Sequence, residues 1–236
     1  MLDQKSPKPL YTQLAEHFRG MIETGELKPG DQFPAELDLV QRYGVARITV
    51  RHAIADLVSE GLLMRRQGKG TFVAAPKIER ALVNVSSFSA RLQAAGLQPS
   101  AKMLRCEVIP APERLAKELR IEPEAPVVVF TRLRYSNGEP LALEFSHLSL
   151  DRCPGLDEVD LNTQSLYRTL EDRYGLRPTH SRKTLELALA RPEEAVALDI
   201  TSGSPLFLLR ATVLGDSDPI EYVKTLMRGD RIRFQI

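Results

Sequence analysis

Apolar residues near the start of the chain recur with the spacing of a helix. The first such stretch follows Pro9 and consists of Leu10, Leu14, Phe18, Met21 and Ile22. A spacing of three or four residues places these side chains on one helical face. Proline suits the first turn of a helix, because that turn does not use its missing N–H. We therefore predict a helix that begins near Pro9 and ends near Gly25.

Two more helical patterns follow the first and are separated by a short turn. The second pattern begins after Pro34 and stops at Gly44, and the third has the apolar stripe Val50, Ile54, Leu57 and Val58. Only Val45 and Ala46 lie between Gly44 and the start of the third pattern. Two helices joined by so short a glycine-containing turn are typical of a helix-turn-helix.

A predicted β-hairpin follows the third helix. Two short apolar runs, one around Leu63 and one ending at Val73, flank the basic, glycine-rich segment 65–70. Glycine allows the backbone at such a tip to approach a narrow groove closely. Arg66 and Lys69 would direct positive charge toward phosphates. This hairpin has the composition of a wing beside a helix-turn-helix.

The second part of the chain contains an internal duplication. Five residues recur 79 positions later, namely Ala116, Leu119, Ile121, Pro126 and Pro140 as Ala195, Leu198, Ile200, Pro205 and Pro219. The first copy predicts strands and a helix at Met103–Val108, Glu113–Leu119 (helix), Val127–Tyr135 and Leu141–Leu148. The second copy predicts Thr184–Leu189, Glu193–Leu198 (helix), Leu206–Leu214 and Ile220–Met227. Residues 136–138 and 215–218 have hairpin-turn chemistry. We expect an antiparallel sheet covered on one side by helices, an α+β fold.

Length and charge add a second kind of information. A chain of 236 residues suits two domains better than one, and its net charge of +1 alone says nothing about nucleic acid. Between Arg42 and Lys69, however, six basic residues face only two acids, Asp56 and Glu60. Such a local excess has the size of a DNA-facing patch, although a solvated helix face would give the same count.

The chain lacks the features of secreted, membrane or metal-binding proteins. Cys106 and Cys153 are isolated and have no metal-ligand or redox spacing, so we expect both to be buried small hydrophobes. No apolar run approaches the length of a membrane helix, and the first eleven residues do not resemble a signal peptide. We therefore expect a cytoplasmic protein without membrane contact, cofactor or metal.

The N-terminal half of the third helix carries polar side chains suited to DNA. Arg47, Thr49, Arg51 and His52 lie there, in the half that a recognition helix inserts into the major groove. Arginine forms bidentate hydrogen bonds with guanine, and threonine reaches a phosphate or a thymine methyl group. The alternative is an ordinary solvated helix face.

Residues 9–73 resemble the GntR family of bacterial regulators. The resemblance rests on segments with matched spacing, namely 9–11, 25–31, 33–36, 43–51, 60–63 and 67–73. It implies that Arg47, Thr49 and Arg51 meet DNA in the major groove and that Gly68 approaches the minor groove. The expected DNA-binding residues are Arg47, Thr49, Arg51, Arg66, Gln67, Gly68 and Lys69.

Three positions depart from the pattern of that family. Ala35 and Ala46 stand where the family usually has serine, so the second and third helices are expected to lack a side-chain N-cap, which is worth about 1 kcal/mol each. Leu37 stands where many members carry a base-contacting arginine. We therefore expect the second helix to contact fewer base edges and the operator to differ accordingly.

Residues 80–236 resemble the UTRA domain of the HutC subfamily, whose fold is shared with chorismate lyase. The matching segments are 87–88, 96–97, 132–134, 138–144, 165–167, 174–176, 221–222 and 228–231. The expected organisation is a winged helix-turn-helix domain at 1–75, a linker at 76–82, and an effector-binding and dimerisation domain at 83–236.

Two arginines mark the expected effector site. Arg132 and Arg134 are two residues apart on a predicted strand and so point to the same face. Glu144 lies on the next strand, on the arginine face for an odd-length loop and on the opposite face for a two-residue turn. Ser165 and Tyr167 begin a helix whose free N–H groups suit an anion, with Asn162 and Thr163 as cap candidates.

The resemblance implies a pocket lined by Arg132, Arg134, Glu144, Ser165, Tyr167, Glu221 and Arg228. The alternative is that the arginines form surface ion pairs, which contribute little stability.

These features predict a DNA-binding repressor whose operator binding is controlled by a small anionic effector, such as a sugar phosphate or a carboxylate. One helix-turn-helix covers half a site, so we expect a homodimer on an inverted repeat. The alternatives are a chorismate-lyase-like enzyme fused to a DNA-binding module and a structural DNA-bridging protein. The sequence contains no nucleophile elbow, phosphate-cradling loop or cofactor signature that would favour the enzyme.

Overall fold

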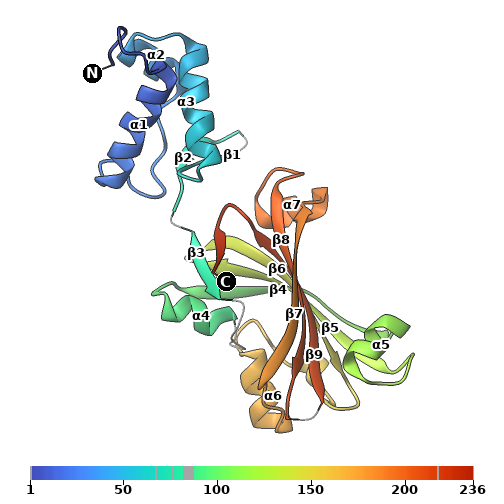
Figure 1. Cartoon of the computed structure of the whole chain (residues 1–236). Helices are drawn as coiled ribbons and strands as arrows, with labels where there is room; N and C mark the ends of the chain where they lie inside the picture. Colours follow the sequence, from blue (N-terminus) through green and yellow to red (C-terminus); the bar gives the residue numbers. More distant parts are fainter. Residues whose placement is uncertain (1, 67, 76, 82–87, 217, 236) are drawn as a thin grey trace. The chain divides into compact units, whose positions relative to one another are not determined.

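A computed structural model describes residues 2–66, 68–75, 77–81, 88–216 and 218–235. The chain forms two compact units, residues 1–77 and 78–236 (Figure 1).

The first unit has the predicted helices and hairpin. Its elements are α1 (Leu10–Glu23), α2 (Glu36–Tyr43), α3 (Arg47–Ser59), β1 (Leu63–Arg66) and β2 (Gly70–Val73). The apolar stripes of the helices meet in one core, in which Leu14, Val50 and Leu57 are fully buried. Gly44 ends α2 in the left-handed conformation with φ of 63°, as a helix-stopping glycine does. Ala35 and Ala46 occupy the N-cap positions of α2 and α3 and provide no side-chain hydrogen bond, as predicted.

The second unit is built on a six-stranded antiparallel sheet. The sheet consists of β4 (Pro99–Pro110), β5 (Pro126–Ser136), β6 (Glu139–Ser149), β7 (His180–Leu189), β8 (Pro205–Leu214) and β9 (Pro219–Arg228). The strand order is β4-β5-β6-β9-β8-β7, so the two copies of the duplication lie side by side and meet at β6 and β9. The duplication that the sequence predicts is thus the internal symmetry of the sheet.

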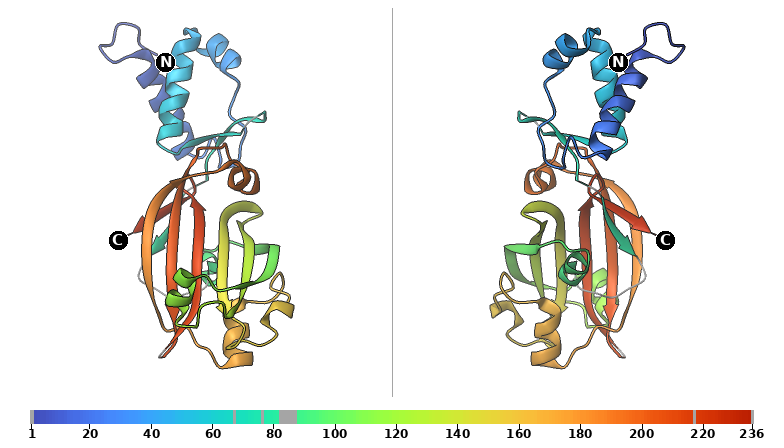
Figure 2. Two further views of the ribbon diagram at one scale, coloured as in Figure 1. Left: turned by 90° about the vertical axis from the view of Figure 1, so that its right-hand side faces the viewer. Right: turned by 90° about the vertical axis from the view of Figure 1, so that its left-hand side faces the viewer.

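Helices cover both faces of this sheet, which corrects the expectation of a single covered face (Figures 1 and 2). On one face lie the helices within the copies, α5 (Glu113–Leu119) and α7 (Pro192–Leu198), packed against strand residues such as Val129 and Leu208. On the other face lie α4 (Phe88–Ala94), the short 3-10 helix Leu156–Glu158 and α6 (Leu166–Tyr174), packed against Phe130, Leu148 and Leu209. The central strands are therefore buried on both sides, which hides the polar and apolar alternation of a half-exposed strand.

The segment that was expected to be a linker contains a strand. Within residues 76–82, β3 (Ile78–Ala81) pairs in parallel with β10 (Ile232–Gln235) near the end of the chain. The backbone N–H of Ile78 also donates to the carbonyl oxygen of Arg231 at 2.8 Å. Four residues are too few to show a period, and the partner strand lies about 150 residues away in the sequence, so no local pattern indicates this pairing.

A bulge in the β5–β6 hairpin determines which side chains face each other. The turn residues Asn137 and Gly138 both have positive φ, as a two-residue type I′ turn requires. The pairing then shifts by one residue, because Tyr135 pairs with Pro140 whereas Arg134 pairs with Ala142. The β8–β9 hairpin has a shift at the corresponding place, next to Val213. This extra residue reverses the faces for the rest of the hairpin.

Candidate functional site

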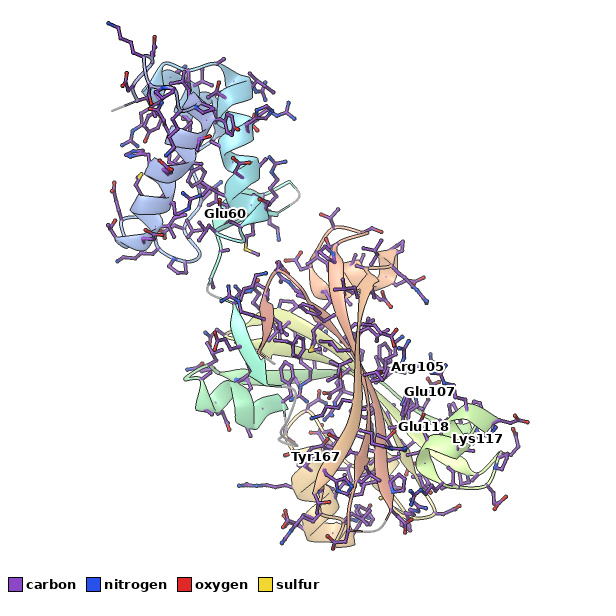
Figure 3. All side chains as sticks on the ribbon, viewed as in Figure 1. Glu60, Arg105, Glu107, Lys117, Glu118 and Tyr167 are labelled. Carbon is purple, nitrogen blue, oxygen red and sulfur yellow. The ribbon has the colours of Figure 1, made fainter. Side chains whose placement is uncertain are left out.

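The face of the sheet covered by α4 and α6 contains a cavity of about 280 Å³. All six strands of the sheet contribute to its lining, together with the segment 161–165, the start of α6, α4 and β10. Six of the seven predicted effector-binding residues line it, namely Arg132, Arg134, Glu144, Ser165, Tyr167 and Glu221. Figure 3 shows Tyr167 at the start of α6, beside the sheet.

Arg132 and Arg134 are the central cationic groups of this cavity. Both side chains are buried, with 5% of each residue exposed. Arg132 Nη2 donates to Glu144 Oε1 at 2.6 Å, and Arg134 Nη1 donates to the same oxygen at 3.5 Å. Arg134 Nη2 also donates to the hydroxyl of Ser89 at 2.7 Å, and its guanidinium lies 4.9 Å from the ring centre of Phe88. The arginines are therefore not surface pairs.

The hairpin bulge brings Glu144 to these arginines. A two-residue turn without a bulge would place Glu144 on the face of the sheet opposite to the arginines. With the one-residue shift, Glu144 is directly across from Arg132 on the neighbouring strand. Cross-strand neighbours of opposite charge stabilise each other, and here both lie out of water.

The arginine pair retains unused hydrogen-bonding capacity. The Nε atoms of Arg132 and Arg134 are buried and have no hydrogen-bond partner among the described residues. Burial also lowers the pKa of Arg134, with Glu144 opposing that effect and Arg132 adding to it. A buried donor without an acceptor is unfavourable by about 1–3 kcal/mol, so an anion in the cavity would relieve both the desolvation and the missing bonds.

A second acid of the cavity, Glu221, lies near Glu144 and is bound by Tyr167. The Tyr167 hydroxyl donates to Glu221 Oε2 at 2.9 Å, and Glu221 is 2% exposed. Burial raises the pKa of Glu221, and the nearby Glu144 raises it further, while Ser146, Arg132 and Tyr167 act in the opposite direction. Burial and Glu221 together raise the pKa of Tyr167 well above its ordinary value. This end of the cavity offers acceptors for hydroxyl or amino groups of a ligand.

The start of α6 provides backbone donors at the same cavity. Ser165 is the N-cap residue of α6, and its side chain makes no capping hydrogen bond. The predicted cap candidates Asn162 and Thr163 do not cap the helix. Asn162 Oδ1 accepts a hydrogen bond from the backbone N–H of Met103, and both residues donate to Asp160.

Arg228 lies away from the other predicted effector residues. It does not appear among the described residues that line the cavity. It is seven positions from Glu221 on β9, and an odd separation places the two on opposite faces of a strand. Its guanidinium instead contacts Asp230, the carbonyl oxygen of Pro140 and Glu139. The expectation that Arg228 lines the pocket is therefore wrong, and its contacts indicate a role in holding the end of β9.

Several residues that line the cavity are not indicated by the sequence. Ser89 and Phe88 come from α4, Lys183 from β7 and Phe234 from β10. None is close in sequence to the arginine strand, and of the four only Phe88 lies in a segment that resembles the UTRA domain. The positions 79 residues after Arg132 and Arg134 are the apolar Ala211 and Val213, so strand β8 does not repeat the arginine pair at the cavity.

The predicted DNA-binding residues lie on α3 and on the wing of the first unit. Arg51 is exposed and Thr49 is half-buried. Arg47 is also exposed, and its Nε donates to Glu36 Oε2 at 3.0 Å, which joins the starts of α3 and α2. In the wing, Gly68 has φ of 71°, and Lys69 is exposed.

Two further residues that were predicted to bind DNA, Arg66 and Gln67, belong to the wing segment. Arg66 is the last residue of β1 and pairs with Gly70. Gln67 lies outside the described residues.

The two cysteines differ in their exposure to solvent. Cys153 is buried as expected, and burial raises its pKa to about 11, whereas Cys106 is exposed. In the part of the chain that the structure describes, no cluster of three or more His, Cys, Asp or Glu residues could hold a metal ion. No helix within those residues is long and apolar enough to cross a membrane.

A winged helix-turn-helix joined to a domain with a buried, charged cavity defines a ligand-responsive, DNA-binding transcription regulator. Family comparison agrees with this class. Residues 10–73 match the model of the gntR family of bacterial regulatory proteins, and residues 94–233 match the UTRA domain. The chain belongs to the GntR family and has the UTRA domain of its HutC-type members.

Known proteins resemble this chain over its whole length. An uncharacterised regulator of Bacillus subtilis, YurK, is 39% identical over 237 residues, covering 100% of this chain and 98% of YurK. The transcriptional repressor NagR of the same organism is 34% identical, covering 99% of this chain and 96% of NagR. The crystal structure of PhnF from Mycobacterium smegmatis superimposes with a TM-score of 0.67 at 33% identity, covering 95% of this chain and 96% of PhnF.

Proposed function

We propose that this regulator is a homodimeric repressor that leaves its operator when a small anion occupies the cavity beside Arg132 and Arg134. The observation that supports this proposal most strongly is that the buried Nε atoms of Arg132 and Arg134 have no acceptor in the part of the chain that the structure describes. Repression is supported by the relative NagR, which is a named repressor.

The charges around the cavity favour an anion with polar substituents. Arg132, Arg134 and Lys183 line it, against the carboxyl groups of Glu144 and Glu221. Three cationic side chains therefore face two carboxyl groups at the cavity. The volume of about 280 Å³ is at the lower end of small-molecule sites, which suits a monosaccharide phosphate or a short carboxylate.

The acid end of the cavity contributes selectivity. Glu221 and Tyr167 would hydrogen-bond hydroxyl or amino groups on the part of the ligand away from the anion. Charge-assisted bonds to two arginines and the N–H groups at the start of α6 would hold the anionic group. We propose Ser165 as part of that anion subsite.

DNA binding is proposed to use α3 and the wing. Arg47, Thr49 and Arg51 would contact base edges and phosphates in the major groove, and the wing tip with Gly68 and Lys69 would lie along the neighbouring minor groove. A single helix-turn-helix covers one half-site, so a two-fold dimer on an inverted repeat supplies the second. This function places the protein in the cytoplasm with its DNA.

We assign no catalytic role to the cavity. The comparisons lead to transcription regulators, and a shared fold is only an analogy for chemistry. Incubation with saturating chorismate tests the alternative directly, since a chorismate-lyase-like enzyme would release 4-hydroxybenzoate.

A thermal-shift screen of sugar phosphates and carboxylates tests the proposal. A compound present at one hundred times its dissociation constant adds about 2.7 kcal/mol of stability when it binds only the folded state. The active compound should also release operator DNA in a fluorescence anisotropy titration. In the Arg132→Ala variant it should do neither. Wild-type release by an Arg132→Ala protein would show that the effector site lies elsewhere.

A further inference from the structure

Two large apolar side chains are exposed on the DNA-binding unit. Leu37 is 61% exposed and Ile48 is 56% exposed, whereas the core residues around them, such as Leu39 and Val50, are buried. They are the exposed large apolar residues of the first unit as far as the structure describes it. Isolated exposed apolar residues are common, so their placement decides whether they have a role.

The two side chains come from the starts of the two helices of the helix-turn-helix. Leu37 is the second residue of α2, and Ile48 is the second residue of α3. The ion pair between Glu36 and Arg47, at 3.0 Å, joins the residues that directly precede them. Leu37 and Ile48 therefore flank one contact between the two helix starts.

The surroundings of this apolar pair are basic. Ile48 is three residues from Arg51 and four from His52, so all three share one face of α3, and all are exposed. Arg47 precedes Ile48, and Arg42 lies exposed on α2. An apolar pair set among exposed arginines suits a polyanion that also presents apolar groups, rather than the apolar surface of another protein.

DNA presents one apolar group on its base edges in the major groove, the C5-methyl group of thymine. The first turns of a recognition helix are the part that reaches those edges. We propose that Leu37 and Ile48 contact thymine methyl groups and thereby select A·T pairs next to the bases that Arg47 and Arg51 contact. This inference rests on the proposed use of α3 as the recognition helix.

Binding-site selection followed by removal of single methyl groups tests the inference. The full-length protein selects its preferred sites from a pool of random duplexes. Each thymine of the consensus is then replaced by deoxyuridine, which keeps the Watson–Crick edge and removes only the methyl group. We expect at least one thymine per half-site at which wild-type affinity falls about fourfold, the factor for burying one CH₂-sized group.

Variants identify which side chain contacts which methyl group. In Leu37→Ala or Ile48→Ala, the deoxyuridine substitution at the matching thymine should change affinity less than twofold, roughly the effect of an ordinary surface change. Both positions are exposed, so these variants should fold, and unchanged affinity for random DNA at low salt confirms it. Val196→Ala is the matched control, because Val196 is 83% exposed and belongs to the other unit. It should retain the full deoxyuridine effect.

Three results would overturn the inference while leaving operator binding intact. They are a consensus without thymine, a wild-type protein that is indifferent to every deoxyuridine substitution, and an equal deoxyuridine effect in wild type and both alanine variants. A pool that yields no consensus would instead contradict sequence-specific binding itself, and with it both the proposed function and this inference.

Discussion

The two units place arginine pairs in opposite environments. Arg47 and Arg51 lie four residues apart on a helix and are exposed, and the ion pair of Arg47 with Glu36 leaves 64% of the Arg47 side chain accessible. Arg132 and Arg134 lie two residues apart on a strand and are 5% exposed. The exposed pair can meet a long polyanion without conformational change. The buried pair needs an acid even when the cavity is empty, and Glu144 provides it.

The difference in burial indicates how arginine can bind two kinds of anion in one protein, DNA at an exposed site and a small molecule at a buried one. Exposed arginines are screened by salt and affect binding more than folding. Buried arginines are screened much less, and their removal affects folding as well as ligand binding.

The largest effect is expected for Arg132→Ala. Removing Arg132 takes away the shorter of the two arginine contacts made by the buried Glu144 carboxylate. The loss of stability should be about 3 kcal/mol, the lower end of the range for breaking a buried ion pair. Urea denaturation of the full chain measures it. The control is Arg210→Ala, which removes a partly exposed pair with Glu186 and should change stability by about 0–1 kcal/mol. Equal losses in the two variants would contradict the contrast.

Arg47→Ala should show the reverse behaviour. Its operator affinity should fall by about 1–3 kcal/mol if Arg47 contacts a base in bidentate fashion. Its stability should change by less than about 1 kcal/mol, because the Arg47 side chain remains 64% exposed in its ion pair with Glu36. Anisotropy titrations with operator and with random DNA measure the loss of specificity. A loss of the same size on both DNAs would remove Arg47 from the base-contacting set.

The third prediction concerns pH and the acid beside the buried arginines. The pKa of Glu221 is raised in the folded protein, chiefly by burial, so the folded state keeps this proton at a pH where the unfolded state has released it. The contribution of Glu221 to the free energy of unfolding is therefore complete at pH values below the ordinary carboxyl pKa. It is lost as pH rises through the raised pKa of Glu221 in the folded protein. Glu221→Gln should flatten this decline and be more stable than wild type above that range. Unfolding curves from pH 4 to pH 8, about the range where such groups titrate, would contradict this if the two proteins declined in parallel.

The smallest effect is expected for Lys69→Ala. Lys69 is exposed at the wing tip and would neutralise one phosphate. Its removal should lower the slope of log affinity against log salt by about 0.9 on every DNA sequence tested. Effector affinity should hardly depend on salt, because the cavity arginines are buried. A steep salt dependence of effector binding would indicate that the effector binds at the surface.

Local patterns predicted most of the second unit. The helix Glu113–Leu119 has the predicted bounds, and the central strands differ from their predicted limits by one or two residues. Turn chemistry and proline positions can be recognised from neighbouring residues, and the repeat of 79 residues can be recognised by comparing the chain with itself. No local pattern indicates the position of the bulge, although the bulge places Glu144 across from Arg132 and not on the opposite face of the sheet.

Features that depend on distant parts of the chain were not predictable from the sequence. Ser89, Lys183 and Phe234 join the cavity from three separate elements. Arg228 matched a family segment, but strand geometry turns it to the other face, where Glu139 and Asp230 bind it. A motif shows which residue stands at a position. The face of the sheet to which its side chain points depends on whether the position is odd or even along the strand, and on any bulge in that strand.

A crystal structure of the full chain with the effector found by thermal shift tests the central claim most directly. The account predicts that the anionic group of the effector lies within hydrogen-bonding distance of the Nε atoms of Arg132 and Arg134, with Tyr167 and Glu221 at its other end. The opposite face of the sheet has a second cleft, lined by Arg114, Arg182 and Arg210. An effector bound there, with the cavity beside Arg132 empty, would contradict the account.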